Sequence, residues 1–330
     1  MGEGPGRVPV IERTIAERGT TGRKGGIALE VERLPTAGIG IMAYNEGRNI
    51  RAILEALITQ RTRCCRLSEI VVVASGCTDD TEAIVHSVAR RDPRIRLLAQ
   101  PRREGKARAI NLYLRSSETD FRVLASADTL PADDAVEALI RPMVEDPTVG
   151  MTGGHVVPVN GDSRFIDHSV HMLWRLHHAI AQHHPKMGEM VAFRNVVNRI
   201  PDDSAVDEVS IEAEVQRQGF RLKYVPDAIV RNKGPETISD FLKQRRRIHA
   251  GHLAARGMTG YAPATMRLTR VGWVFLADAL KRPGRLPWSL GTAALEATGR
   301  ALGTYDHYVT GRSHAVWEIA VTTKDVKEHR

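Results

Sequence analysis

The sequence predicts an α/β protein with a mostly parallel, twisted sheet covered by helices on both faces. Three observations predict this class. Short apolar segments rich in β-branched residues alternate with segments of helical spacing, four times in succession. Polar residues end these strand-like segments, as expected where strands turn into helices. The composition, with 42% hydrophobic and 26% charged residues, is that of an ordinary globular chain and not of a disordered one.

The first two units follow a region rich in Gly, Arg and Glu. Residues 39–43 form a short apolar segment, which predicts a buried strand, and 44–46 interrupt it. Apolar residues then recur at helical spacing over 50–57. The β-branched segment 70–73 predicts the second strand. A turn and a helical pattern over 83–88 complete the second unit.

The next two units repeat this order. Residues 95–98 predict the third strand and 105–114 the helix after it. Residues 123–125 predict the fourth strand, and 136–143 carry apolar residues at helical spacing. A further strand is predicted over 149–159. Parallel strands require such crossovers, and right-handed crossovers give the sheet its twist.

The polar segments after the strands are the first place to look for a ligand site. They are 44–46, 75–79 and 126–128. In open sheets of this kind, ligands bind beyond the carboxyl ends of the strands. A dinucleotide fingerprint would place glycines between the first strand and its helix, whereas Gly38 and Gly40 lie before and inside the strand. The sequence has no Walker-type loop either, so neither cofactor class is expected.

Charge and composition restrict the partners. A net charge of +8 calls for a negatively charged partner, such as a phosphorylated small molecule or anionic lipid. Nucleic acid is not expected, because aromatic residues make up only 5% of the chain and no nucleic-acid-binding motif is found. There is no membrane-spanning apolar stretch, no secretory signal and no disulfide framework among three cysteines. A cytoplasmic location, at most at the inner face of the membrane, is therefore expected.

Four motifs occupy these strand ends and helix starts. They are Met-Ala-Tyr-Asn-Glu at 42–46, Ala-Ser-Gly-Cys-Thr-Asp-Asp-Thr at 74–81, Gly-Lys-Ala-Arg-Ala-Ile-Asn at 105–111 and Ser-Ala-Asp at 126–128. Two more follow: Asp207-Glu208, with a Gly-Phe-Arg segment after it, and Gln244-Arg245-Arg246-Arg247-Ile248. In this order they resemble the family-2 glycosyltransferases, over about residues 38–252. The resemblance implies the A-type glycosyltransferase fold, which is Rossmann-like. The C-terminal region lies outside the resemblance, and its amphipathic pattern predicts a helical extension.

The resemblance implies a role for each motif. Donor-binding residues are expected at Ala43, Tyr44, Glu46, Ser75, Lys106, Ser126, Ala127, Arg194, Gln244, Arg245 and Arg247. Asp128 stands where the family places its usual metal ligand, and His252 is a candidate second ligand for Mg²⁺ or Mn²⁺. Magnesium often needs only one or two protein carboxylates, so a serine at position 126 is compatible with binding. Glu208 takes the position of the catalytic base, with Asp207 as the alternative.

We expect three regions: an N-terminal arm over 1–36, a catalytic domain over 37–255 and amphipathic helices over 256–330. Apolar and basic residues are mixed within 267–285, which suits either an interfacial helix on anionic lipid or a helix packed on the catalytic domain. The protein could also form a homo-oligomer.

The predicted function is metal-dependent, inverting transfer of a hexose by single displacement. The expected donor is a nucleoside-diphosphate sugar. A UDP-sugar is favoured, and a GDP-sugar is the alternative. The acceptor hydroxyl belongs to a lipid-linked molecule, a small metabolite or a protein. A second hypothesis is a non-catalytic scaffold of the same fold that binds an anionic partner, because Ala74, Ser75 and Ser126 stand where the family carries acids.

Overall fold

A computed structural model describes residues 33–312, 314 and 316, so most of the predicted arm lies outside the described residues. Within them, eight strands form one sheet in the order β3-β2-β1-β4-β7-β6-β8-β5. The strands are β1 (Thr36–Ala43), β2 (Arg66–Ser75), β3 (Ile95–Gln100), β4 (Phe121–Ser126), β5 (Thr129–Pro131), β6 (Val149–Pro158), β7 (Met190–Arg194) and β8 (Arg221–Asn232). Only β7 and β5 run against the others, which confirms the mostly parallel sheet.

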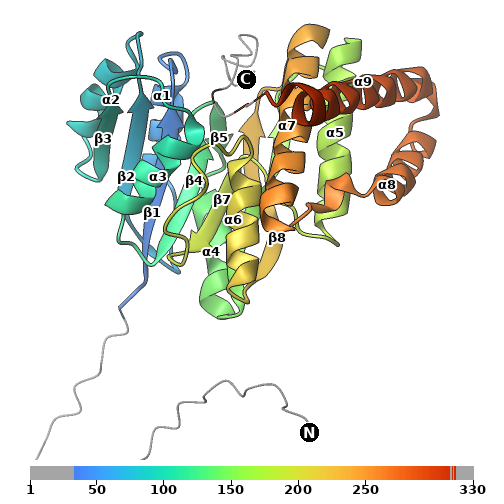
Figure 1. The fold of residues 1–330 in the computed structure, drawn as a ribbon. Coiled ribbons are helices and arrows are strands. Elements are labelled where there is room, and N and C mark those ends of the chain that lie inside the picture. The colour runs from blue at the N-terminus through green and yellow to red at the C-terminus, as the bar shows by residue number, and fades with distance from the viewer. Residues whose placement is uncertain (1–32, 313, 315, 317–330) are drawn as a thin grey trace, which may run out of the picture. The chain divides into compact units, whose positions relative to one another are not determined.

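Helices lie on both faces of this sheet (Figure 1). The α-helices are α1 (Ile50–Ile58), α2 (Thr81–Ala89), α3 (Lys106–Ser116), α4 (Ala135–Glu145), α5 (Phe165–Ala181), α6 (Asp207–Arg217), α7 (Ile238–Thr259), α8 (Leu268–Leu280) and α9 (Leu286–Tyr305). The four β-α units predicted from the sequence are confirmed, each within a few residues of its predicted bounds. The predicted domain boundary at 255–256 falls inside α7.

Alternation along the strands divides the core into two layers. In β2, Ile70 and Val72 face the layer that packs against α1, α2 and α4, whereas Val71 and Val73 face the layer with α3 and α6. Gly40 in β1 faces α3, where a Cβ atom would lie 2.5 Å from the Tyr113 ring. The absence of a side chain at this position therefore lets α3 approach the sheet closely.

The register brings three strand ends to the same edge. Ala43 at the end of β1 pairs with Ala74 of β2, and Met42 pairs with Ser126 at the end of β4. Because these strands are parallel, the segments after them emerge side by side. The chain at Asn45 adopts a left-handed conformation with φ +52°. Its side chain bonds the loop after β2, accepting from the Thr78 amide at 2.8 Å.

Helices α5, α7, α8 and α9 form a group beside the β8 end of the sheet (Figure 1). Close approach of α9 to α7 depends on Gly299 and Gly303, where a Cβ atom would meet α7 atoms at 2.5–2.6 Å. An ion pair between Arg245 on α7 and Glu296 on α9, with N–O distances of 2.5 and 3.0 Å, crosses the same contact. Thus α9 is held to the catalytic part of the chain.

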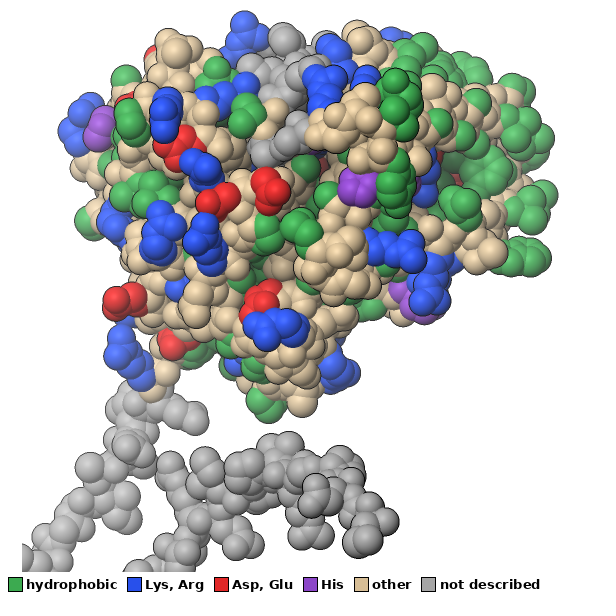
Figure 2. All heavy atoms as spheres, in the orientation of Figure 1, with side chains coloured by type: hydrophobic (Ala, Val, Ile, Leu, Met, Phe, Trp, Pro, Cys, Tyr) green, Lys and Arg blue, Asp and Glu red, His purple; other side chains and the backbone are tan. Residues whose placement is uncertain are grey.

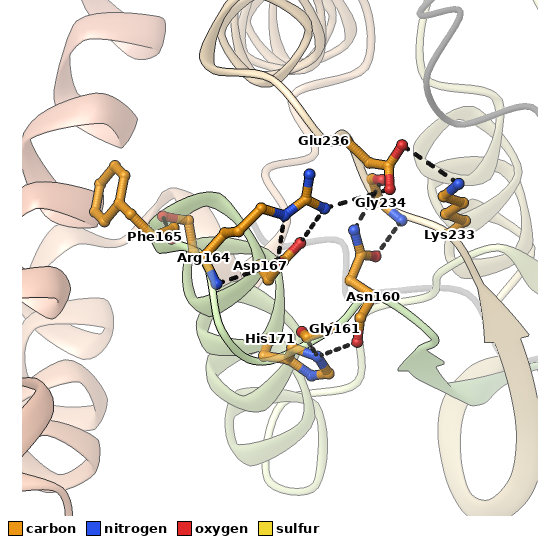
Figure 3. A network of polar contacts seen from close by, with 10 residues as sticks. Asn160, Gly161, Arg164, Phe165, Asp167, His171, Lys233, Gly234 and Glu236 are labelled. Atoms are coloured by element: carbon orange, nitrogen blue, oxygen red, sulfur yellow. Dashed lines mark hydrogen bonds and ion pairs between the residues drawn. The ribbon is translucent and has the colours of Figure 1, made fainter. Parts of the chain in front are cut away.

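A polar network fixes the loop before α5 to the loop after β8 (Figure 3). The Asn160 side chain donates to the Gly234 carbonyl at 3.1 Å and accepts from its amide at 2.7 Å. Arg164 bonds both the buried Asp167 carboxylate, at 2.8 and 2.9 Å, and Glu236, at 3.3 Å. These contacts hold the backbone around Gly234, which lines the cavity described next.

Candidate active site

A cavity of about 690 Å³ opens at the sheet edge where β1, β2 and β4 end. Its volume is within the range of small-molecule sites. Most of the residues predicted from the sequence line it: Ala43, Tyr44, Glu46, Ser75, Lys106, Ser126, Ala127, Asp128, Glu208, Gln244, Arg245, Arg247 and His252. The structure therefore brings together motifs that are up to two hundred residues apart in the chain.

The loops after β1 and β2 form the end of the cavity where donor-binding residues were predicted. The Arg103 guanidinium stacks over the Tyr44 ring at 4.1 Å from its centroid. Ser75 is buried, and its Oγ accepts from the Glu104 amide at 3.2 Å. Glu46 is buried and accepts from the Asn49 amide at 3.0 Å. Aromatic, hydroxyl and carboxylate groups thus converge where a base and a ribose can stack and bond.

Lys106 lies between the two candidate bases. Its backbone begins α3 after Gly105, whose φ of +95° favours glycine. The Lys106 Nζ lies 2.9 Å from Asp207 Oδ2 and 3.5 Å from Glu208 Oε1, at the start of α6. Donor binding by Lys106 stays a prediction; in the structure its ammonium group pairs with the two acids.

The two acids differ in exposure and in pKa. The Asp207 side chain is 3% exposed and does not line the cavity, whereas the Glu208 side chain is 22% exposed and does. Burial and the neighbouring Glu208 charge raise the pKa of Asp207. Burial alone would raise the pKa of Glu208 as well, but the charge of Lys106 outweighs it and the pKa is lowered. Glu208 is therefore the ionised acid that faces the cavity.

Arg247 faces the same acids from α7. Burial lowers its pKa to about 10, against the opposing effect of Glu208, Asp207 and Glu189. Gln244, one turn earlier, also lines the cavity, as helical spacing predicted. Arg247 thus brings a second cation to the acids of the site.

Glu189 precedes β7 and is a residue that the predicted site set omitted. It lines the cavity, and burial together with the Asp128 charge raises its pKa to about 7. Two carboxyl groups therefore approach each other at the end of β4. The only sequence signal was the likeness of Gly188–Arg194 to the family segment that lines the donor-sugar pocket.

The carboxyl groups of Asp128 and Glu189 are the candidate ligands for a metal ion. Among the described residues, no group of three or more His, Cys, Asp or Glu side chains is arranged to hold an ion. Asp128 and Glu189 nevertheless present hard oxygen donors whose mutual repulsion a dication would relieve, and Mg²⁺ is often held by one or two carboxylates together with substrate phosphates. The residues present therefore fit a divalent ion that binds together with a diphosphate.

His252 lines the cavity, but its electrostatic surroundings are cationic. Burial and the charges of Lys186, Arg245 and His249 hold its pKa well below the ordinary value, so the imidazole is neutral. Its pairing with Asp128 at one metal ion stays a prediction.

Two arginines have other partners than those predicted. Arg194 ends β7 opposite Phe121, the first residue of β4, and thus lies at the other edge of the sheet. It donates to the Val149 carbonyl at 2.8 Å and also to the Met143 carbonyl, and it does not line the cavity. The prediction that Arg194 binds the donor is therefore corrected. Arg245 lines the cavity but is paired with Glu296.

Fold and site together define a protein of the A-type glycosyltransferase class, with a sheet edge that suits a nucleotide sugar. Residues 39–201 match the family described as Glycosyl transferase family 2, and residues 123–296, more than half of the chain, match Glycosyl transferase family group 2. The chain belongs to the family-2 glycosyltransferases.

Among solved structures, the mannosyltransferase PcManGT of Pyrobaculum calidifontis, in complex with GDP-Man and Mn²⁺, is 26% identical. The similarity covers 91% of this chain and 89% of that one, with a TM-score of 0.56. An N-acetylglucosaminyltransferase of Bradyrhizobium diazoefficiens is 22% identical over 74% of this chain and 52% of its own length. A poly-β-1,6-N-acetyl-D-glucosamine synthase of Staphylococcus aureus is 23% identical over 68% and 56%. The chain thus spans about half the length of these two relatives.

Proposed function

We propose that this chain transfers a hexose from a UDP- or GDP-sugar to an acceptor hydroxyl, with inversion at the anomeric carbon. The observation that carries the proposal is Glu208 of α6, paired with Lys106 in a cavity that Asp128 also lines. Family membership and the likeness to PcManGT, which was solved with GDP-Man, support it. The relatives named N-acetylglucosaminyltransferases support transfer of an N-acetylglucosaminyl group equally.

In this mechanism Glu208 is the general base. It takes the proton of the acceptor hydroxyl while the hydroxyl oxygen attacks the anomeric carbon and the bond to the diphosphate breaks. Lys106 keeps Glu208 ionised, and Arg247 places positive charge near the departing diphosphate. Asp207, more deeply buried, orients Lys106. Because attack and departure are concerted on opposite faces, one displacement inverts the centre.

A divalent ion, Mg²⁺ or Mn²⁺, is proposed at Asp128 and Glu189. When bound, it would neutralise charge on the diphosphate as a Lewis acid. His252 is the second ligand predicted from the sequence. We expect Asp128→Asn to abolish the Mn²⁺-dependent part of the thermal stabilisation by the donor while leaving the unfolding temperature of the free protein nearly unchanged.

The experiment that tests the function compares two matched variants with each other. We expect Glu208→Gln to lower kcat by about 10²–10⁴-fold and Asp207→Asn to lower it less, measured as release of nucleoside diphosphate from a panel of sugar nucleotides. Glu214→Gln, farther along α6 and paired with Arg217, is the control. Rates near wild type in both acid variants would contradict the mechanism, and absence of turnover with every donor would favour the scaffold hypothesis.

The protein is also proposed to act at the inner face of a membrane, through residues 267–285. None of the described helices combines the length and the apolar character needed to cross a bilayer. Exposed apolar side chains of α8 and basic residues at its two ends support contact with an anionic surface.

A further inference from the structure

The cavity extends well beyond the polar groups that a sugar nucleotide needs. The lining that α5, α8 and α9 contribute is mostly apolar, although His177, Thr292, Glu296 and Arg300 also belong to it. We name its apolar part the apolar chamber and define it by six residues: Val170, Leu173 and Trp174 of α5, Val271 and Phe275 of α8, and Ala293 of α9. The chamber and Glu208 belong to the same cavity.

Helical spacing explains why the chamber is apolar. On α5 Leu173 and Trp174 follow Val170 by three and four positions, and on α8 Phe275 follows Val271 by four, so each helix directs these apolar side chains to the cavity. Polar side chains of these helices bond one another where the helices pack. Ser169 bonds Thr292 at 2.8 Å, and Arg175 bonds Asp278 at 2.9 Å.

This lining is unsuited to a sugar chain. Hydroxyl groups placed against carbon walls would lose their bonds to water without replacement, at a cost of about 1–3 kcal/mol each. A hydrocarbon chain in the same place would instead gain about 0.8 kcal/mol for each buried methylene. Ile248 of α7 also lines the cavity with an apolar side chain.

The chamber also borders an apolar outer surface. Leu268 lines the cavity and is 71% exposed, and it begins the same helix that exposes Trp273, Leu276 and Leu280. Figure 2 shows hydrophobic side chains gathered at the end of the molecule where α8 and α9 lie. Leu268 therefore connects the apolar outer surface to the cavity, on the side where the hydrocarbon chain of an acceptor held in a lipid surface would enter.

We propose that the acceptor is an amphiphile, whose hydrocarbon chain occupies the apolar chamber and whose polar head reaches Glu208. The inference rests on the proposed function, since it names the acceptor class of that same site. It concerns the hydrocarbon chain of the acceptor and leaves the chemistry of the acceptor's polar head open.

The test uses dodecyl phosphate below its micelle concentration, with methyl phosphate as the probe that has the same head and no chain. Binding is measured by isothermal titration calorimetry to the full chain. We expect dodecyl phosphate to bind at least about tenfold more tightly than methyl phosphate. Ala293→Phe fills the chamber and should weaken dodecyl phosphate binding by about tenfold or more. Ala294→Phe, the adjacent and exposed position outside the cavity, should bind within about twofold of wild type.

Donor binding separates this inference from the proposed function. We expect thermal stabilisation by the sugar nucleotide to be the same in Ala293→Phe, Ala294→Phe and wild type. Equal binding of the two phosphates, or unaltered dodecyl phosphate binding in Ala293→Phe, would overturn the chamber assignment while the donor result stood. A protein that bound the alkyl probe and no sugar nucleotide would overturn the proposed function and with it the role of the chamber as an acceptor site.

Discussion

Lys106 is the residue on which the electrostatics of the site depend. Its ammonium group contacts Asp207 and Glu208, and its pKa is raised because these acids outweigh the effect of burial. Without this cation, two adjacent carboxylates would lie in a partly dry cavity. The residue therefore determines which protonation state the proposed base has at neutral pH.

Replacing Lys106 with glutamine should move the acid limb of the kcat/KM pH profile to higher pH. Burial acts to raise the pKa of Glu208 and the charge of Lys106 acts to lower it, so removing this charge should raise that pKa. Because the ionised form is the base, activity should be lost at a higher pH than in wild type, by about 1–3 pH units. Lys106→Arg keeps the charge and should leave the limb near its original position. An unmoved limb in Lys106→Gln would mean that Glu208 is not the group that titrates.

Whether the sequence predicted the position of a residue depended on whether that position follows from local patterns or from contacts with distant segments. Tyr44, Ser75 and Asp128 were predicted correctly to lie at one edge, because strand register follows from local patterns. The contact between Lys106 and the acids joins segments one hundred residues apart, and no periodicity encodes it. Arg194 was misplaced for the same reason: β7 runs antiparallel to β4, and a sequence pattern does not give strand direction.

At the scale of elements, the position of α9 determines which partners the three consecutive arginines of α7 have. Arg245 pairs with Glu296, and Arg246 pairs with the buried Asp306 just after α9. Arg247 is left to face the acids of the cavity. The sequence predicted the helix and the shared face of Gln244 and Arg247, but the partners of the other two arginines required the position of α9, which followed from no motif.

Substituting Glu296 with glutamine should loosen the contact of α9 with α7. Burial opposes ionisation of Glu296, but Arg245 and Arg300 outweigh it and lower the pKa to about 2. A lowered pKa adds stability above the unfolded value of about 4.5, and this stability is lost as the pH falls toward 2. We expect Glu296→Gln to reduce the free energy of unfolding at pH 7 by about 2–3 kcal/mol, measured by urea titration.

The difference between wild type and Glu296→Gln should shrink as the pH is lowered below about 4.5, since Glu296 is then protonated in the unfolded chain and, near pH 2, in the folded protein as well. Glu145→Gln, at an exposed position on α4, is the matched control and should change stability by less than about 0.5 kcal/mol. A difference that stayed constant from pH 7 to pH 3 would show that packing, and not the charge of Glu296, holds α9.

At the scale of the whole molecule, apolar surface and positive charge meet at one end. Exposed apolar residues gather on α8 and the start of α9, with Trp273 75% and Leu280 72% exposed (Figure 2). Basic residues lie at both ends of α8: Arg267, Arg270, Lys281, Arg282 and Arg285. The sequence left two readings open, an interfacial helix or a packed one. In the structure one stripe of α8 lines the cavity and another is exposed, so the helix is packed on one side, and contact of its exposed side with lipid stays a prediction.

This arrangement should bind vesicles that contain anionic lipid. We expect the protein to sediment with phosphatidylcholine–phosphatidylglycerol vesicles and much less with pure phosphatidylcholine, because apolar insertion and charge attraction act together. Trp273→Asp combined with Leu280→Asp should reduce partitioning by about tenfold or more, since charged side chains would replace the inserted ones.

Lys281→Glu should weaken binding at low salt and have less effect at high salt, where screening already reduces the attraction. Val144→Asp alters an exposed apolar residue on α4, 43% exposed and outside this surface, and should bind as wild type does. If Val144→Asp and the double variant lost binding equally, the contact would be a general property of the basic surface and α8 would have no special part in it.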